Sequence, residues 1–164
     1  MKVVASRFGE LEVREEEIFT AVRTLPGFPN SSRYFFIERR NIAPFRWMQS
    51  ADEPDLTFVV VEPDKFFHDY EPRVGAFDLE EIGLGRGEQP FVLVIVVLPE
   101  DLTKMTANLK GPLMFNLKER KFKQAFIETE KYTVRESIIE GIRRKEKARL
   151  EGEEGTGAKS TKSG

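Results

Sequence analysis

Short apolar runs separated by turn-forming residues dominate the first 135 residues of the chain. Lys2–Ala5 and Leu11–Val13 flank a turn that contains glycine, and Phe45–Ser50 alternates between apolar and polar residues as a half-buried strand does. Phe58–Val61 and Phe91–Leu98 are continuous and rich in β-branched residues, which is typical of strands inside a sheet. The pattern therefore predicts short strands, with residues 91–98 as a central one.

Proline, glycine and acidic residues mark the connections between these runs. Asp52–Asp55 contains one proline and three acids, which favour a tight turn, so the runs on either side are predicted to form a hairpin. Leu25–Phe28 has the Pro-Gly pair of a type II turn. Gly111 and Pro112 interrupt the extended segment Met105–Asn116, which predicts a bulge or an edge position.

Two segments have helical patterns. Asp78–Leu84 reads as a short helix with Asp78 as its N-cap. Glu136–Leu150 is the long helical candidate, which Gly141 weakens by up to about 1 kcal/mol relative to alanine. Residues 151–164 contain no core-forming residue, so we expect them to be disordered.

Together these elements predict a mainly β fold, an antiparallel β-barrel-like single domain with one or two short helices and a C-terminal helical or disordered extension. About eight short strands at spacings near ten residues, without βαβ alternation, are typical of a barrel or sandwich. Residues 15–22 are compatible with a helical turn or a strand. The remaining strand candidates are Tyr34–Ile37, Phe122–Ile127 and a short one at Tyr132 and Val134. The predicted layout is a barrel domain over 1–135, a helix over 136–150 and a tail over 151–164.

Composition fits one globular domain in a reducing compartment. The chain has 164 residues, of which 40% are hydrophobic, including 14 phenylalanines. No apolar run approaches the roughly 20 residues that span a bilayer, and the N-terminus lacks the apolar stretch of a signal peptide. The absence of cysteine excludes disulfides and thiol catalysis. We therefore expect a cytoplasmic protein.

Charge is distributed unevenly along the chain. The net charge is −2, yet the segment from Arg143 to the end carries seven basic and four acidic residues, so the body before it is mildly acidic. Nucleic-acid-binding surfaces are normally concentrated basic patches, so the body is a poor candidate for one. A basic partner suits it better. The basic segment after Arg143 is compatible with a solvated helix face or with contact to RNA or a membrane surface.

The residues show no persuasive active site. His68 is the only histidine, so Ser-His-acid catalysis would need it, although a binding or plain surface role is the simpler interpretation. The acidic clusters lack the spacing of a calcium loop. Gly83–Gly87 follows a helix and precedes a strand, the reverse of a phosphate-binding loop. We expect no enzymatic activity, no metal and no cofactor.

An aromatic loop lies between Pro63 and Pro72 and contains Phe66, Phe67 and Tyr70. Its rings are compatible with packing over one end of the barrel, with anchoring a protein interface, or with stacking on bases. The missing basic groove disfavours the last. Aromatic residues beside acidic ones suit a basic, partly apolar peptide.

The segment Lys104–Leu109 has two interpretations. One is an ordinary strand entry. The other is an exposed strand edge, whose free backbone N–H and C=O groups would accept a segment of a partner protein and which the following Gly111-Pro112 would protect from aggregation. Because the inferred edge is protected in this way, we expect a monomer.

Five strings of the sequence, in this order, resemble the bacterial flagellar assembly factor FliW family: VVASRFGELEV, LPGF, FRWMQSADEPDLTFVVVEP, FFHDYEP and VLPEDLTKMTANLKGPLMFN. The resemblance covers roughly residues 2 to 135. It implies a cytoplasmic, non-enzymatic chaperone-like protein that binds the translational repressor CsrA and also flagellin. Such a protein holds CsrA off the flagellin message until newly made flagellin competes for it. The extension after Arg135 is longer and more basic than the family core requires.

We place the predicted protein-binding surface on the acidic aromatic loop, with the 104–108 segment beside it. Its residues are Phe67, Asp69, Tyr70, Glu71, Pro72, Lys104, Met105, Thr106 and Asn108. The resemblance implies no direct contact with nucleic acid or membrane. The competing interpretation is a nucleic-acid- or peptide-binding β-barrel module without a flagellar role.

Overall fold

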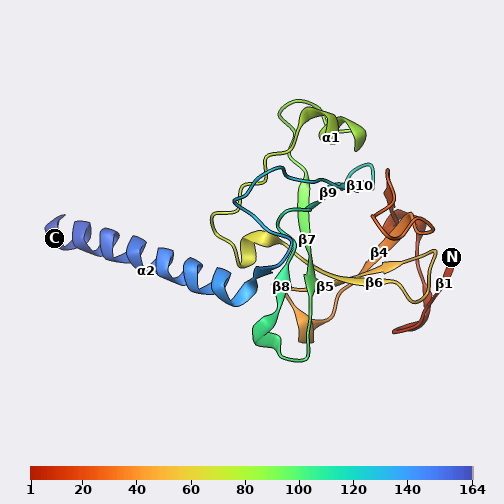
Figure 1. The fold of residues 1–164 in the computed structure, drawn as a ribbon, viewed down its shortest axis with the longest axis horizontal. Coiled ribbons are helices and arrows are strands. Elements are labelled where there is room, and N and C mark those ends of the chain that lie inside the picture. The colour runs from red at the N-terminus through yellow and green to blue at the C-terminus, as the bar shows by residue number, and fades with distance from the viewer. Residues whose placement is uncertain (164) are drawn as a thin grey trace.

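A closed barrel forms the body of the protein. The computed structural model describes residues 1–163, with side chains through residue 152. Within that range the strands form one two-stranded hairpin and one nine-stranded sheet (Figure 1). The sheet order is β11-β8-β7-β6-β5-β4-β3-β10-β9, and an additional pairing of β7 with β9 closes seven strands into a ring. The predicted barrel is confirmed.

The elements have the following bounds. The strands are β1 Lys2–Ala5, β2 Gly9–Glu12, β3 Phe19–Ala21, β4 Arg33–Ile37, β5 Arg46–Ser50, β6 Thr57–Val61, β7 Phe91–Val97, β8 Thr106–Ala107, β9 Leu113–Asn116, β10 Lys121–Gln124 and β11 Glu136–Ser137. The α-helices are α1 Ala76–Glu81 and α2 Ile138–Ser163, and short 3-10 turns are η1 Glu15–Glu17, η2 Arg40–Ile42, η3 Pro63–Lys65 and η4 Leu102–Lys104.

Successive side chains on a barrel strand belong alternately to the hydrophobic cluster inside the barrel and to a cluster on its outer face. Along β7, Leu93 belongs to the cluster inside the barrel, and Val94 belongs to a cluster on its outer face. Along β4, Tyr34 points inward and Phe35 outward in the same way. Successive residues of a strand face opposite sides of the sheet. A strand that is apolar throughout must therefore be covered on both faces of the sheet.

Three structures cover the outer face of the barrel. The β1–β2 hairpin packs Val3 with Phe35 of β4, and the α1 region packs Ile82 with Met114 of β9. The loop after β6 and the start of α2 cover the outer face of β6, β7 and β8. In Figure 1 the hairpin and α1 lie on separate sides of the barrel, and α2 projects away from it. The candidate site lies in the third covering structure.

Several sequence predictions match and some require correction. The hairpin of β5 and β6 is antiparallel as predicted, and β7 is central because it pairs with β6, β8 and β9. One pair of neighbouring strands is parallel instead of antiparallel. It joins β10 to β3, with Phe122 beside Ala21. The N-cap of α1 is Gly75, so Asp78 lies inside the first turn and pairs with a lysine.

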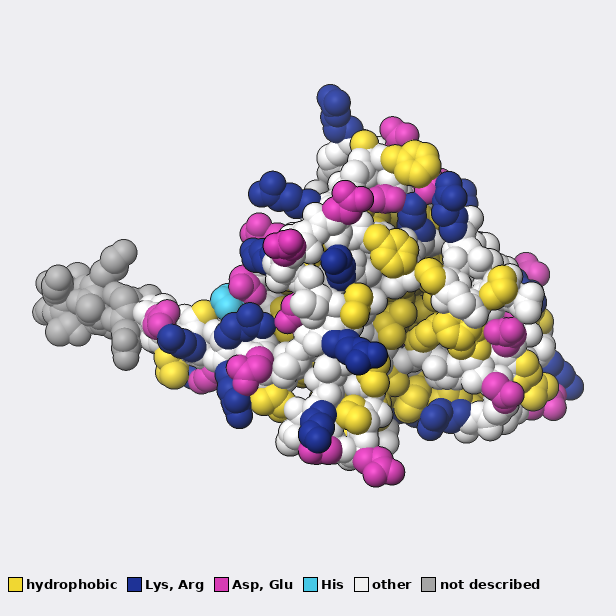
Figure 2. Space-filling model, viewed as in Figure 1, with side chains coloured by type: hydrophobic (Ala, Val, Ile, Leu, Met, Phe, Trp, Pro, Cys, Tyr) yellow, Lys and Arg dark blue, Asp and Glu magenta, His cyan; other side chains and the backbone are white. Residues whose placement is uncertain are grey.

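The C-terminal helix also differs from its prediction. It begins at Ile138, because residues 136–137 form β11, and its bounds extend past Leu150 to Ser163. The short strand expected at Tyr132 and Val134 is replaced by β11. Figure 2 shows acidic and basic side chains interspersed along the coloured part of α2. Residues 151–164 were expected to be disordered. Most of their side chains, and the whole of residue 164, lie outside the described part of the chain, so that expectation stays a prediction.

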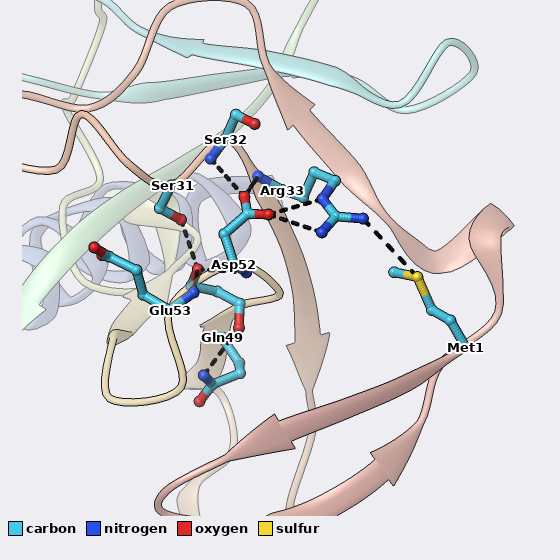
Figure 3. A network of polar contacts seen from close by, with 8 residues as sticks. Met1, Ser31, Ser32, Arg33, Gln49, Asp52 and Glu53 are labelled. Atoms are coloured by element: carbon cyan, nitrogen blue, oxygen red, sulfur yellow. Dashed lines mark hydrogen bonds and ion pairs between the residues drawn. The ribbon is translucent and has the colours of Figure 1, made fainter.

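The turn between β5 and β6 is fixed by Asp52 (Figure 3). Its carboxylate accepts backbone N–H bonds from Ser32 at 2.8 Å and Arg33 at 2.9 Å, and the Arg33 Nε–H at 2.9 Å. Burial alone would raise the pKa of Asp52, but these bonds outweigh it and lower that pKa. Ser50 Oγ accepts the Glu53 N–H at 2.9 Å. The predicted turn is confirmed and is tied to the strand β4.

Candidate protein-binding site

The aromatic loop folds back onto the barrel. After β6 the chain makes the turn η3 and then buries Phe67, whose residue is 2% exposed, against Val61 and Val94. Phe66 and Tyr70 pack at the edge of the same cluster. Packing over the barrel, one of the interpretations left open, therefore describes Phe67. This ring supports the loop and is not itself available to a partner.

Two tyrosines hold the acidic part of the loop. The rings of Tyr70 and Tyr132 meet edge to face with centroids 4.8 Å apart. Tyr70 Oη donates to the Leu109 carbonyl at 2.7 Å, and Tyr132 Oη accepts the Glu71 N–H at 3.0 Å. Tyr132 Oη also lies 3.4 Å from the Asp69 carbonyl, to which it donates. Burial, and then the neighbouring Tyr132, raise the pKa of Tyr70, so its hydroxyl remains a donor.

The segment 69–73 presents its side chains alternately. Tyr70 and Pro72 line one hollow, which Pro63 and Phe91 also line, whereas Glu71 and Arg73 line a second hollow on another side. An extended backbone produces this alternation. The Asp69 side chain is 54% exposed, and Glu71 is exposed as well. The carboxylates of Asp69 and Glu71 are therefore accessible to solvent, and the hydrogen bonds of Tyr132 hold the backbone that carries them.

Of the two interpretations of Lys104–Leu109, the ordinary strand entry agrees with β8 and the exposed strand edge is wrong. Strand β8 is paired on both sides, with Ala107 beside Val96 of β7 and also beside Glu136 of β11. The Asn108 N–H donates to the Ile95 carbonyl at 2.9 Å. The chain returns after Tyr132 and supplies β11 as the missing partner, so no free ladder remains there for a partner segment.

The remaining predicted residues of that segment differ in accessibility. Lys104 is exposed at the end of η4, and Met105 is partly buried in the cluster that contains Phe67. Thr106 is half-buried in β8. Asn108 Oδ1 accepts the backbone N–H groups of Lys110 and Gly111, at 3.1 and 2.8 Å, so it shapes the turn before β9. Any side-chain contact with a partner would therefore centre on Lys104.

The first turns of α2 join the two predicted segments. The Ile138 N–H donates to the Met105 carbonyl at 3.1 Å, and the Lys145 ammonium donates to the carbonyls of Asp64 at 2.8 Å and Lys65 at 3.0 Å. Gly141 is buried against Phe67. The base of α2 thus lies between the aromatic loop and the 104–106 segment. Sequence reasoning missed this role, although a glycine inside a helical pattern signals a close approach of this kind.

Other kinds of site find little support in the described residues. His68 Nδ1 lies 4.0 Å from Asp69 Oδ1, and the imidazole is exposed. Within the described part of the chain, no group of three or more histidine or acidic side chains is arranged to hold a metal ion. No helix in residues 1–163 combines the length and apolar character needed to cross a membrane.

Comparison with known proteins shows the family to which this barrel belongs. The family model described as FliW protein matches residues 2–138. The chain belongs to the FliW family. The matched range ends where α2 begins, so nearly all of this helix lies beyond the FliW model.

Similar FliW proteins come from several organisms. The flagellar assembly factor FliW of Natranaerobius thermophilus is 37% identical over 140 residues, covering 85% of this chain and 93% of the relative. That of Leptospira biflexa is also 37% identical, over 82% of this chain and 89% of the relative. A crystal structure of the flagellar assembly factor FliW has a TM-score of 0.78 and 25% identity, over 84% of this chain and 96% of the other. This chain is therefore a member of a family of flagellar assembly factors.

Proposed function

We propose that this protein binds the translational repressor CsrA and flagellin, and that it couples flagellin synthesis to export by switching between them. Membership of the FliW family carries the proposal, because its relatives are named as flagellar assembly factors. While bound here, CsrA cannot repress the flagellin message. Flagellin that accumulates in the cell displaces CsrA, and repression resumes. No catalytic step is required of the protein.

The acidic aromatic loop is the proposed contact surface for CsrA. Asp69 and Glu71 are exposed, and the hydrogen bonds of Tyr132 to their backbone keep the segment in one conformation. A preformed segment loses less conformational entropy on binding than a mobile one. Lys104 is exposed in the 104–106 segment, which the base of α2 separates from the loop.

Calorimetric titration of the purified protein with CsrA, and separately with flagellin monomer, tests the proposal. Saturable binding to both is expected, with a weaker CsrA signal after preloading with flagellin. Reversal of two charges, Asp69→Lys with Glu71→Lys, should weaken CsrA binding at least about tenfold, because like-charge repulsion would replace attraction. A protein that bound neither partner would refute the proposed function.

A matched control separates local charge from net charge. Glu15 and Glu16 are exposed in η1, next to the β1–β2 hairpin, and their reversal to lysine changes the net charge by the same amount. This control variant should bind CsrA like the unmodified protein. Equal weakening by both pairs would indicate a general electrostatic effect and would remove the loop as the contact surface. Retention of the flagellin leader RNA by this protein alone would favour the nucleic-acid-binding alternative.

A further inference from the structure

The parallel pairing between β3 and β10 stops early. Val22 donates its backbone N–H to the Phe122 carbonyl at 2.9 Å, which is the last hydrogen bond between these two stretches. After Val22 the chain turns away, because the Arg23 guanidinium pairs with Glu81 of α1 at 2.8 Å and Leu25 is buried in the barrel. The stretch that follows β10 therefore loses its neighbour on this side.

The other side of that stretch remains paired. The Ala125 N–H donates to the Pro112 carbonyl and the Ile127 N–H to the Lys110 carbonyl, each at 2.9 Å. In an extended chain successive peptide groups point to opposite sides. The backbone groups of Phe126 and Glu128 accordingly point to the side that β3 has left, and no hydrogen bond joins them to any residue in the described range.

The surroundings of this edge are apolar and of mixed charge, because Arg73 and Lys131 line the hollow beside it together with Glu71 and Glu128. Phe126 is 64% exposed and Phe77 is 62% exposed. The Phe77 ring lies 5.4 Å from Lys123 Nζ on β10 and 5.9 Å from Arg23 Cζ, so it marks the point where β3 diverges. Glu128 is exposed, and the neighbouring Glu71 and Glu130 are exposed too. None of these three carboxylates forms an ion pair within residues 1–152.

We propose that the edge at 124–128 is a docking site for an extended segment of a partner protein that carries alternating apolar and basic residues. The segment adds a strand beside Phe126 and Glu128, whose backbone groups supply the ladder hydrogen bonds. Its apolar residues contact the exposed ring of Phe126, and its basic residues face the carboxylate of Glu128 and its neighbours. Glu71 borders both this site and the acidic aromatic loop, but the backbone groups that would pair with the added strand are those of Phe126 and Glu128.

A peptide probe tests the site without CsrA or flagellin. The probe is a ten-residue synthetic peptide of alternating valine and lysine, added to the isotope-labelled full chain at millimolar concentration and followed by NMR. Saturable shifts and slowed hydrogen exchange are expected at the amides of Phe126 and Glu128. The matched peptide of alternating valine and glutamate should bind at least about tenfold more weakly, because its charges repel those of the site. Absence of any saturable shift at these amides would overturn the proposal.

Two substitutions at one position separate the backbone from the ring. Phe126→Pro removes the ring together with the free N–H, whereas Phe126→Ala removes the ring and keeps the N–H. Proline is tolerated where the N–H has no partner in the fold, and the melting temperatures of the two variants check this. The proline variant should bind the valine-lysine peptide about tenfold more weakly than the alanine variant. Equal affinity in the two variants would contradict strand addition at this edge.

Discussion

Gly141 of α2 lies directly against Phe67 of the aromatic loop. A Cβ atom at position 141 would be 2.5 Å from Phe67 Cε1 and 2.8 Å from the backbone carbonyl oxygen of Phe66. Both distances are shorter than any contact that a side chain tolerates. The glycine therefore sets how closely α2 approaches the loop that presents Asp69 and Glu71.

Gly141→Ala should destabilise the protein by about 1 to 3 kcal/mol, because overpacking at a buried contact outweighs the gain in helix propensity. The loop or the helix must move, since a backbone oxygen cannot rotate out of the way. Urea unfolding measures the loss, and amide exchange at 66–72 locates it. The matched change in the same helix is Gly152→Ala, where a Cβ would meet nothing within 4 Å. This control should be neutral or slightly stabilising, and an equal loss in both variants would contradict the packing argument.

Tyr132→Phe should make the segment 69–71 more mobile, while the ring still fills its place in the hydrophobic cluster that contains Phe67. The phenol accepts the Glu71 N–H at 3.0 Å, and the residue is 8% exposed, so its loss leaves a backbone donor without its partner. The expected cost is about 1 kcal/mol of unfolding free energy, with faster exchange of the Glu71 amide. NMR hydrogen exchange gives the second quantity directly. Unchanged exchange at Glu71 would show that the tyrosine hydroxyl does not hold the segment.

Lys123→Met should destabilise the protein, because it removes the buried ion pairs between β10 and α1. The Lys123 side chain is 7% exposed, and its ammonium lies 2.6 Å from Asp78 Oδ1 and 2.5 Å from Glu81 Oε1. Burial alone would lower the pKa of Lys123, but the two carboxylates outweigh it and raise that pKa, so the charge is retained. Removing the ammonium leaves two carboxylates facing each other, of which Glu81 keeps Arg23. The loss should be about 2 to 3 kcal/mol by urea unfolding.

The control for this variant lies on the same strand. Lys121 is exposed, with 48% of its side chain accessible, and its ammonium lies 3.6 Å from Glu119 Oε2. Lys121→Met should change the unfolding free energy by less than about 0.5 kcal/mol, since an exposed pair is screened by water. A similar loss in the two variants would mean that hydrophobic substitution on β10, and not loss of the buried charge, is responsible.

The strands were predictable because their signal is local. Apolar runs such as β7 and the turn at Asp52–Asp55 carry their pattern in adjacent residues. The parallel pairing of β3 with β10 was not predictable in this way, because it joins segments about a hundred residues apart and neither segment specifies its neighbour. The two-residue strand β11 is polar, Glu136 and Ser137, and has no periodicity to detect.

The candidate site was predictable in part for the same reason. The aromatic composition of the loop predicted that its rings either pack over the barrel or anchor a partner, and it could not show that Phe67 is buried while Tyr70 lies at the edge of the same cluster. Whether Lys104–Leu109 was an edge depended on β11, so the missed strand produced the wrong prediction of a free ladder. The support from α2 depended on Gly141, which by composition alone looked only like a weakness in the helix.

Asp52→Asn should make the stability of the protein less sensitive to acid. The folded state lowers the pKa of Asp52 below its ordinary value of 3.8, because the hydrogen bonds from Ser32 and Arg33 outweigh the effect of burial. A lowered folded pKa adds stability that is fully present above the unfolded pKa and is lost as pH falls through the folded one. At pH 7 the asparagine variant should therefore be less stable by about 1 to 2 kcal/mol, and this difference should shrink below about pH 4. Urea unfolding at a series of pH values measures both effects, and a difference that stayed constant down to pH 2.5, about a unit below the unfolded value, would contradict the assignment.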